Sequence, residues 1–510
     1  MRIRDREEPI ALAEHVADVP RAFDDILGVA KDECCRLVTQ FSNDPNEVAA
    51  HRVETELADL MAAVATHLTA MALMLAHRNE QFVATTKHQA REGIDTAGAP
   101  VTRREKGNAR VKVTFLSGVA LYIRTTYFAP VRARKRQKRG ATGSGSYPIL
   151  EGLGIWHRCT AALASTVARL TVTCSSAAEA SAVLALHGCL LRPDRVHRVT
   201  SWFAEAAVQE RITRTAAAME GVVFSTELAG KRIMIGVDGT MMQVREGQKR
   251  GRRRKKTRRR ATRPTWREAK MFVIYILDEN GDIERKDIAP VYDGTLGDCE
   301  AVMSLLTAEL CARGARFAKE IILVADGALW IWDRADQLIS DVGIDSARVT
   351  KVADFYHAAE YLTEIADLVS SLKRKGSPER TRWLKKMKRL LRAGNIERLI
   401  EEAEALCVGR RAKAIDRKIN YFRKRVERMR YARFRALGIP RGSGAMESAV
   451  RRVVCLRLKG ASISWTERGA EGALLLRSYA KAGRWEELVH RVIKRPDKKP
   501  IDTWELAIAA

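Results

Sequence analysis

The chain has 510 residues, 46% of them hydrophobic, and its 90 Lys and Arg against 62 Asp and Glu give a formal net charge of +28. A chain of this length is too long for a single compact core. No apolar run reaches ~18 residues and the N-terminus lacks a signal-peptide core, so we expect no transmembrane helix and predict a cytoplasmic protein. The excess positive charge predicts a polyanionic partner, with nucleic acid ahead of a ribosome or a membrane surface.

The nine cysteines are scattered and include no Cys-x-x-Cys pair, so a zinc ribbon is not expected. Their number is odd, and a reducing compartment disfavours disulfides. We therefore interpret them as small, mostly buried hydrophobic residues.

Residues 1–130 are predicted to form an N-terminal helical region with a β-hairpin. The stretch 46–79 is Ala-rich and lacks Gly and Pro, which is typical of a bundle or dimerisation helix. Residues 110–128 alternate and are rich in Val, Thr, Ile and Tyr, which predicts a hairpin turning near Ser117 and Gly118. A basic Gly/Ser linker at 131–148 follows and contains Arg134, Lys135 and Arg136.

Residues 149–230 are predicted to be helical. Ser175 or Ser176 is a candidate N-cap for a helix that ends near Gly188, and a second helix opens around Pro193. This layout is that of a helix-turn-helix DNA-binding region, and a plain scaffold helix pair is the alternative.

From residue 231 the pattern changes to strands at 232–238, 270–278, 285–291, 320–325 and 349–353, with a helix at 297–314 between the third and the fourth. This order predicts an α/β domain with a mixed sheet. The remaining predicted segments are the first part of that domain at 231–354, a basic helical insertion at 355–435, closing helices at 436–485 and a C-terminal tail at 486–510, of which 492–510 is expected to pack loosely.

Two of the predicted strands run into an Asp-Gly pair. In "RIMIGVDG" the pair is Asp238 and Gly239, and in "EIILVADG" it is Asp326 and Gly327. If the strands are parallel neighbours, both carboxylates meet at the carboxyl edge of the sheet, where open α/β sheets bind ligands. Two close carboxylates repel unless a proton or cation lies between them, and a hard divalent cation with oxygen ligands is the natural solution.

A two-metal phosphoryl-transfer site needs one more acid. The best candidate is Glu447 in "PRGSGAMESAVRRVV", where a Pro/Gly-rich loop leads into a helix. A carboxylate in a first turn suits the helix dipole, Ser443 or Ser448 is placed to assist the cap, and Arg451 and Arg452 lie one turn further on. If Glu447 lies elsewhere, the candidates for the third acid are Asp354, Glu467 and Glu471.

The order of these motifs resembles the RNase H-like DDE transposases, and within them the Kra-type insertion-sequence transposases of bacteria. The resemblance covers about 149–480 and includes "GVDGTMMQVREGQKRGRRRKKTRRR", "TWREAKMFVIYILDENGDI", "ADGALWIW", "DFYHAAEYL" and "RGSGAMES…RLKGASISW". It implies an RNase H-like mixed sheet with an all-helical insertion. It also implies that Asp238, Asp326 and Glu447 hold two Mg²⁺ ions, which Mn²⁺ can replace.

The resemblance further implies the activity and the partners. The chain is expected to cleave DNA and transfer strands at the ends of an insertion sequence, with double-stranded terminal-repeat and target DNA as partners. A homodimer or higher oligomer on DNA, nucleoid association and no membrane contact are expected with it. The alternatives are a nuclease or resolvase of the same fold without strand transfer, and an inactive, transposase-derived DNA-binding protein.

Two further motifs carry accessory predictions. "DFYH" places Asp354 and His357 beside the site, and a capping Asp with a surface His is the alternative. Trp465 either stacks on a DNA base or packs against the final helix, and packing is favoured. Members of the family often carry Cys-x-x-Cys ahead of the helix-turn-helix, and this chain has no cysteine there, so its hairpin folds without metal or its DNA reader differs.

A basic run, "KRGRRRKKTRRR" at 249–260, follows the first of these strands. Its like charges repel, so we expect it to be disordered in the free protein and to contact DNA phosphates. A generic solubilising or targeting run is the alternative. Its predicted DNA-binding residues are Arg250, Arg252, Arg253, Arg254, Lys255, Lys256, Arg258, Arg259 and Arg260.

Overall fold

The structure is a computed structural model, and it describes residues 19–94, 100–131, 145–245, 264–284, 288–372, 374–460, 463 and 465–494. Among these, the chain forms two compact units. The first extends to Ala206 and includes 489–494, and the second comprises Ala207–Leu488. The basic run 249–260 and the linker residues Arg134, Lys135 and Arg136 lie outside the described residues.

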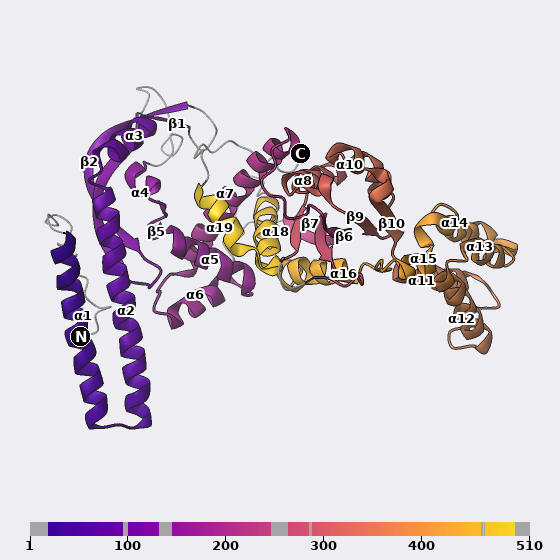
Figure 1. The fold of residues 1–510 in the computed structure, drawn as a ribbon, viewed down its shortest axis with the longest axis horizontal. Helices are drawn as coiled ribbons and strands as arrows, with labels where there is room; N and C mark the ends of the chain where they lie inside the picture. The colour runs from indigo at the N-terminus through magenta and orange to yellow at the C-terminus, as the bar shows by residue number, and fades with distance from the viewer. Residues whose placement is uncertain are drawn as a thin grey trace, which may run out of the picture. The chain divides into compact units, whose positions relative to one another are not determined.

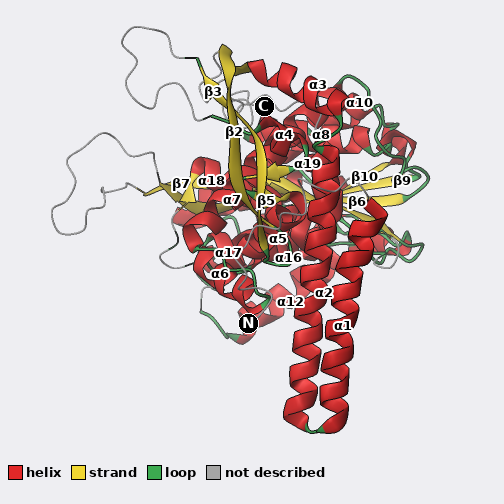
Figure 2. Cartoon of the chain, turned by 90° about the vertical axis from the view of Figure 1, so that its left-hand side faces the viewer, coloured by secondary structure: helices red, strands yellow, loops and turns green. Residues whose placement is uncertain are grey.

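The first unit begins with two long helices that lie side by side (Figures 1 and 2), α1(Val19–Asn43) and α2(Glu47–Ala76). Asn46 caps α2 by accepting a hydrogen bond from the backbone N–H of Ala49. We expected no helix that could span a membrane, but the length and composition of α2 would allow it to cross a membrane. Core helices of soluble proteins pass the same test, so α2 does not decide between the two settings. A short helix follows, α3(Glu80–Arg91).

The expected hairpin is confirmed and is longer than the sequence indicated. Strands β2(Pro100–Thr114) and β3(Ala120–Pro130) pair antiparallel, and Gly118 supplies the positive φ of +83° that the turn between them needs. A three-residue strand, β1(Glu92–Ile94), pairs with β2 on one side.

The predicted helix pair is present as α6(Ala177–Leu186) and α7(Pro193–Met219), preceded by α4(Pro148–Gly152) and α5(Ala161–Thr173). Ser176 is the N-cap of α6, and its hydroxyl accepts a hydrogen bond from the N–H of Glu179. The prediction that 149–230 is helical is wrong in part. Two short strands, β4(Ile155–Trp156) and β5(Cys159–Thr160), form a tight hairpin between α4 and α5.

The second unit is built on a mixed sheet with the strand order β10-β9-β6-β7-β8, to which β11 pairs at β6. Strands β6, β9 and β10 are parallel, whereas β7 is antiparallel to both β6 and β8. This confirms the predicted α/β class, and Figure 2 shows the strands side by side. The strands are β6(Arg232–Arg245), β7(Pro264–Leu277), β8(Val291–Thr295), β9(Glu320–Ala325), β10(Val349–Ala353) and β11(Trp465–Thr466).

Two strand boundaries differ from expectation. β6 does not end at Asp238 but continues to Arg245, because it pairs with β7 along its whole length. The strand expected at 285–291 begins only at Val291, and residues 285–287 lie outside the described part of the chain. The regular pairing of β6 with β7 therefore extends past the point where the apolar pattern in the sequence stops.

Helices cover both faces of this sheet. Along β6, Ile233, Ile235 and Val237 face the helices α8(Cys299–Ala312), α9(Leu329–Trp332) and α10(Ala335–Val342). Met234 and Met242 face the opposite core, which includes α16(Gly444–Val450) and α18(Glu467–Ala482). This alternation is the two-residue period of a strand buried on both sides.

The stretch from 355 to 435 is helical, as predicted, and its apolar residues continue the α16 and α18 core. Its helices are α11(Phe355–Leu368), α12(Pro378–Ala393), α13(Ile396–Glu404), α14(Ala412–Arg423) and α15(Tyr431–Ala436). A short α17(Leu456–Leu458) precedes β11. The C-terminal tail was predicted to begin at 486 and to pack loosely from 492, but residues up to 494 form a regular helix, α19(Trp485–Lys494), and the later residues lie outside the described part of the chain.

Candidate acidic active site

Three parallel strands each have an aspartate directly after the last residue of their parallel pairing, at the same edge of the sheet. The last parallel pair between β6 and β9 is Val237 with Ala325, and the last pair between β9 and β10 is Ala353 with Ala325. The next residues are Asp238, Asp326 and Asp354. The register thus brings together the two acids that the sequence analysis singled out and one that it assigned an accessory place.

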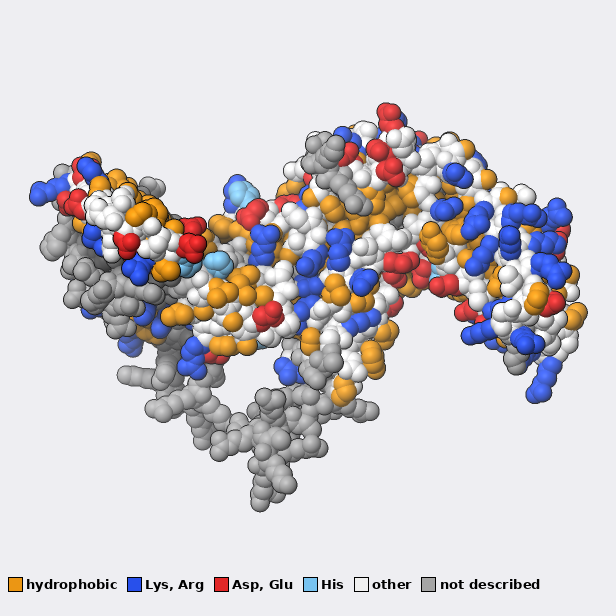
Figure 3. Space-filling view, turned by 90° about the horizontal axis from the view of Figure 1, so that it is seen from below, with side chains coloured by type: hydrophobic (Ala, Val, Ile, Leu, Met, Phe, Trp, Pro, Cys, Tyr) orange, Lys and Arg blue, Asp and Glu red, His pale blue; other side chains and the backbone are white. Residues whose placement is uncertain are grey.

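These aspartates and Glu447 line one cavity of about 150 Å³. Its other lining residues are Val237, Tyr356, His357, Glu360 and Ser443. In Figure 3 a group of Asp and Glu side chains lies beside helices that are crowded with Lys and Arg. Glu447 comes from α16, whose Met446 packs so closely on β6 that a Cβ at Gly236 would lie 3.1 Å from the Met446 Cβ. This packing is what brings Glu447 to the edge of the sheet.

Asp238 is partly buried and has no cationic partner among the described residues. Its Oδ1 accepts a hydrogen bond from the N–H of Gly239 at 2.7 Å. Burial raises the pKa of Asp238 to about 6, the Gly239 N–H opposes the rise, and the negative charges of Asp326, Glu447 and Glu268 add to it. Asp238 therefore lies among negative charges whose mutual repulsion a bound cation would reduce.

Asp326 is held in place by the chain on both sides of it. Its Oδ1 accepts the N–H of Ala328 at 2.9 Å, and its carbonyl oxygen accepts the indole N–H of Trp332 at 2.8 Å. These bonds fix the turn that leads from β9 into α9.

The next residue, Gly327, is in close contact with the helical insertion at 355–435. Arg425 donates to the Gly327 carbonyl at 2.8 Å, and a Cβ at Gly327 would lie 2.7 Å from the Tyr421 ring. Tyr421 stacks on Tyr361 with ring centroids 4.0 Å apart, and Arg425 lies 4.4 Å over the Tyr421 ring. The sequence analysis missed both residues, because nothing in a basic helical segment singles out the one arginine that reaches a turn far away in the sequence.

Asp354 is buried and its carboxylate is occupied by backbone donors. Oδ1 accepts the N–H of His357 at 2.7 Å, and Oδ2 accepts the N–H of Ser443. It thereby caps α11 and ties β10 to the loop that leads into α16. Asp354 is thus a helix cap that also lines the cavity, and His357 lines it too, with its Nδ1 3.5 Å from Glu360.

Glu447 is exposed in the first turn of α16, which begins at Gly444. Ser443 is the N-cap residue, but its side chain makes no capping hydrogen bond and instead donates to Glu447 Oε1 at 3.4 Å. The two alternative third acids have other partners. Glu467 lies 3.3 Å from Arg267, and Glu471 lies 2.5 Å from Arg211.

Arg451 is exposed on the π-helical turn that follows α16, and its side chain has no ion pair or hydrogen bond within the described residues. Trp465 packs against the core that includes α18, with the Arg457 guanidinium 5.0 Å over its ring, and its buried indole N–H has no hydrogen-bond partner among the described residues. These contacts match the favoured reading of Trp465 as a packing residue.

The donor set at this edge fits a magnesium ion in chemical type. All candidate ligands are carboxylate oxygens, and Mg²⁺ is usually held by one or two carboxylates together with waters and phosphate oxygens. Within the described part of the chain, no three His, Cys, Asp or Glu side chains are already close enough together to hold a metal ion. The acids therefore line the cavity without forming a closed ligand cage.

No family model, curated protein or solved structure matches this chain.

Proposed function

We propose that this chain is a DDE-type DNA transposase, which cleaves DNA at the ends of an insertion sequence and joins the freed 3′-hydroxyl to target DNA. The observation that carries the proposal is the convergence of Asp238, Asp326 and Glu447 on one cavity. None of these three has a cationic partner among the described residues, and they come from positions 88 and 121 residues apart (326 − 238 and 447 − 326). Asp238 is partly buried among these negative charges, which is costly without compensation, and perturbed acids of this kind gather at functional sites.

The topology supports an RNase H-like catalytic domain. The first strand of the sheet, β6, lies at its centre between the second and the fourth. Asp238 lies on that first strand, Asp326 follows the fourth, the helical segment follows the fifth, and Glu447 opens the helix after it. This is the order that the resemblance to DDE transposases implies.

The helical insertion offers a surface suited to a DNA backbone. Arg382, Lys385 and Arg389 are exposed on α12 at a spacing that places them on one face. None has a carboxylate partner within the described residues, and Figure 3 shows Lys and Arg gathered over α12 to α14. Such contacts position a duplex through its phosphates without reading its sequence.

Within this proposal, Asp238, Asp326 and Glu447 hold the divalent ions. Bound there, Mg²⁺ supplies charge neutralisation at the phosphate and a more acidic attacking hydroxyl. The protein's own contribution is position. Arg425, Trp332 and the Ala328 N–H fix the turn of Asp326, while Asp354 fixes the loop before Glu447. Holding both sides of the cleft rigid keeps the phosphodiester in line for displacement.

Strand cleavage tests the proposal directly. The full-length protein is incubated with Mg²⁺ or Mn²⁺ and a plasmid that carries the DNA flanking its own gene, and nicked and joined products are separated on a gel. We expect Asp326→Asn to lower the cleavage rate at least about 10³-fold, equal to ~4 kcal/mol of barrier. Asp333→Asn, an exposed substitution seven residues on, is the matched control and should cleave like the wild type.

The outcomes separate the alternatives. Cleavage followed by joining to target DNA supports a transposase. Cleavage without joining, when both ends are supplied, identifies a nuclease or resolvase and overturns the strand-transfer part. If the wild type and Asp326→Asn are equally inert while DNA binding persists, the chain is a DNA-binding protein and the enzymatic proposal fails.

A further inference from the structure

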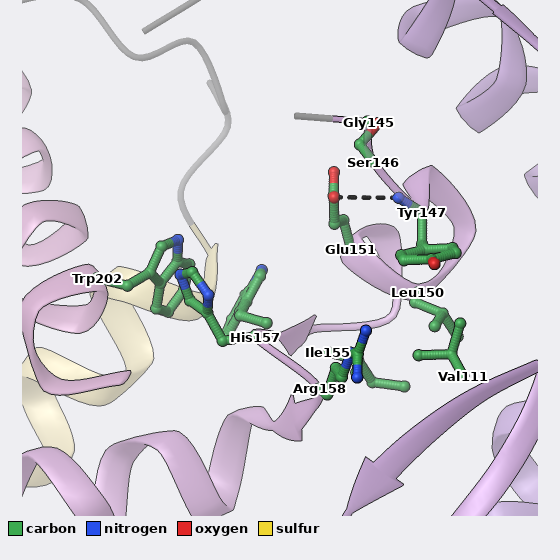
Figure 4. A pocket seen from close by; sticks show the side chains of 11 residues that line it. Val111, Gly145, Ser146, Tyr147, Leu150, Glu151, Ile155, His157, Arg158 and Trp202 are labelled. Carbon is green, nitrogen blue, oxygen red and sulfur yellow. Dashed lines mark hydrogen bonds between the residues drawn. The ribbon is translucent and has the colours of Figure 1, made fainter. Parts of the chain in front are cut away.

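The first unit contains a second cavity, of about 390 Å³, between the β4–β5 hairpin, the start of α4 and α7. Figure 4 shows Trp202 and His157 on one side of it, Tyr147 and Glu151 on the other, and Arg158 between them. Its volume lies within the range of small-molecule sites, and its walls combine aromatic rings with a few polar groups.

One wall of this cavity is an aromatic stack. Trp156 and Trp202 lie with ring centroids 4.5 Å apart and planes 27° apart, and the His157 ring meets Trp202 edge-on at 6.2 Å. Both indoles are only partly buried. Large aromatic rings at the mouth of a cavity offer a stacking surface to a flat ring from outside.

The polar side chains of the cavity are presented by a strained turn. His157 and Arg158 have φ angles of +49° and +63°, and they are the two non-glycine residues with positive φ in the described chain. Two consecutive positive φ angles between paired strands make a turn that normally uses Asn-Gly, because side chains clash there. Such strain persists where the surroundings enforce it, and it gathers at functional sites.

The surroundings of this turn do enforce it. The carbonyl of Arg158 accepts hydrogen bonds from the N–H of Thr114 at 2.8 Å and from the guanidinium of Arg195 at 3.1 Å. Arg195 also donates to the Thr114 hydroxyl at 3.2 Å. The side chains of His157 and Arg158 are therefore held at the cavity by bonds to the backbone behind them.

The charge at the cavity favours an anion beside the rings. The Arg158 guanidinium is exposed and has no carboxylate partner among the described residues. Burial lowers the pKa of His157, and the nearby Arg198 and Arg195 lower it further. The neutral imidazole then has one donor and one acceptor nitrogen at pH 7. Across the cavity, the Glu151 carboxylate accepts the Tyr147 N–H at 3.3 Å.

We propose that this cavity binds one unpaired nucleotide, with its base against the Trp156–Trp202 stack and its phosphate at Arg158. Every nucleobase has a π-face that stacks on aromatic side chains, and a guanidinium suits phosphate oxygens. Glu151 and His157 supply hydrogen-bonding groups for the base edge. The nucleotide comes either from a DNA strand with an extrahelical base, which rests on the proposed function, or from a free mononucleotide.

Fluorescence of 2-aminopurine tests the proposal on the full-length protein. The probes are a duplex with one unpaired 2-aminopurine, the same duplex fully paired, and free AMP as a competitor. We expect the unpaired probe to be quenched on binding and to bind at least tenfold more weakly to Trp202→Ala, while Trp202→Phe, which keeps a ring, stays within about threefold. The paired duplex should bind Trp202→Ala within about twofold of the wild type.

Arg158→Gly separates binding from folding. Glycine relieves the positive φ, so the melting temperature should stay equal or rise, while affinity for the unpaired probe falls severalfold. If AMP competes with the probe and the competition depends on Trp202, a free nucleotide is supported as the source. If AMP does not compete while the probe still binds, DNA is supported as the source. Equal affinity of the wild type and both variants for the unpaired probe would falsify the proposal. Asp326→Asn should bind the probe normally, so failure of the catalytic proposal remains distinguishable.

Discussion

The second unit contains two groups of acids, one buried and one lining a cavity, and they differ in their partners. In the first, Arg211 of α7 donates to Asp293 at 3.1 Å and to Glu471 at 2.5 Å, and all three side chains are buried. Glu471 also accepts the N–H of Leu296 at 2.8 Å. In the second, Asp238, Asp326 and Glu447 share a cavity with no such arginine.

The difference teaches which buried acids serve the fold. Burial raises the pKa of Asp293 to about 6 although Arg211 opposes it, so the shift alone does not distinguish it from Asp238. The partners do distinguish them, because the Arg211 group has a cation and backbone donors for its oxygens. Removing the cation from the first group would leave buried charges unpaired, whereas the proposed function assigns the second group to a bound cation.

Removing the cation from the complete group should have the largest effect on stability. Arg211→Met leaves Asp293 and Glu471 buried without a positive partner, and we expect a loss of about 3–5 kcal/mol in the free energy of unfolding. Denaturant titration followed by circular dichroism measures it. Arg214→Met on the same helix is the matched control. Its partner Glu309 keeps Arg313 at 2.7 Å, so the loss should be clearly smaller. Equal losses would show that the Arg211 group has no special role.

Supplying a cation to the incomplete group should stabilise the protein. At Mg²⁺ concentrations near 100 times the dissociation constant, we expect a gain of ~2.7 kcal/mol over EDTA-treated protein at matched ionic strength. A thermal melt measures the gain. Arg211→Met should gain as much as the wild type, whereas a variant with both Asp238→Asn and Asp326→Asn should gain nothing. An unchanged gain in that double variant would place the ion elsewhere.

Asp354 belongs with the complete group, although it lies at the cavity. Asparagine can still accept the N–H of His357 but loses an acceptor for the N–H of Ser443, so Asp354→Asn should destabilise by about 1–3 kcal/mol. Asp345→Asn is the control, because Asp345 caps only the Ala347 N–H and asparagine is an equally good cap. If the two substitutions lower the free energy of unfolding equally, the hydrogen bond between Asp354 and the 440–443 loop contributes nothing measurable to stability.

The sequence supported the α/β class and the pairing of Asp238 with Asp326, because both depend on short-range patterns. An apolar strand followed by Asp-Gly occurs twice, and two parallel strands in register bring such residues together. The true end of β6 was not predictable in the same way. Its continuation to Arg245 depends on pairing with β7, and the apolar pattern does not record it.

The long-range contacts around the two groups of acids could not be predicted from the sequence. Arg425 reaches Gly327 across 98 residues, and Arg211 reaches Glu471 across 260. In the sequence Glu447 was the best candidate for the third acid, and Glu471 was one of its alternatives. The fold shows that Glu471 has an arginine partner and that Glu447 has none among the described residues. Whether an acid has a positively charged partner is determined by the tertiary structure.

The smallest predicted effect gives the sharpest contrast, because the change in stability has opposite signs at Asp238 on β6 and at Asp354 after β10. Without divalent ions, Asp238→Asn removes a charge that its surroundings disfavour and keeps an oxygen to accept the Gly239 N–H. One pKa unit corresponds to ~1.4 kcal/mol, so we expect a gain of about 1–2 kcal/mol at pH 7. Glu447→Gln, at an exposed position, should change stability by less than about 0.5 kcal/mol. A loss for Asp238→Asn like that of Asp354→Asn would mean that Asp238 is satisfied within the fold, and the two groups of acids would no longer differ in kind.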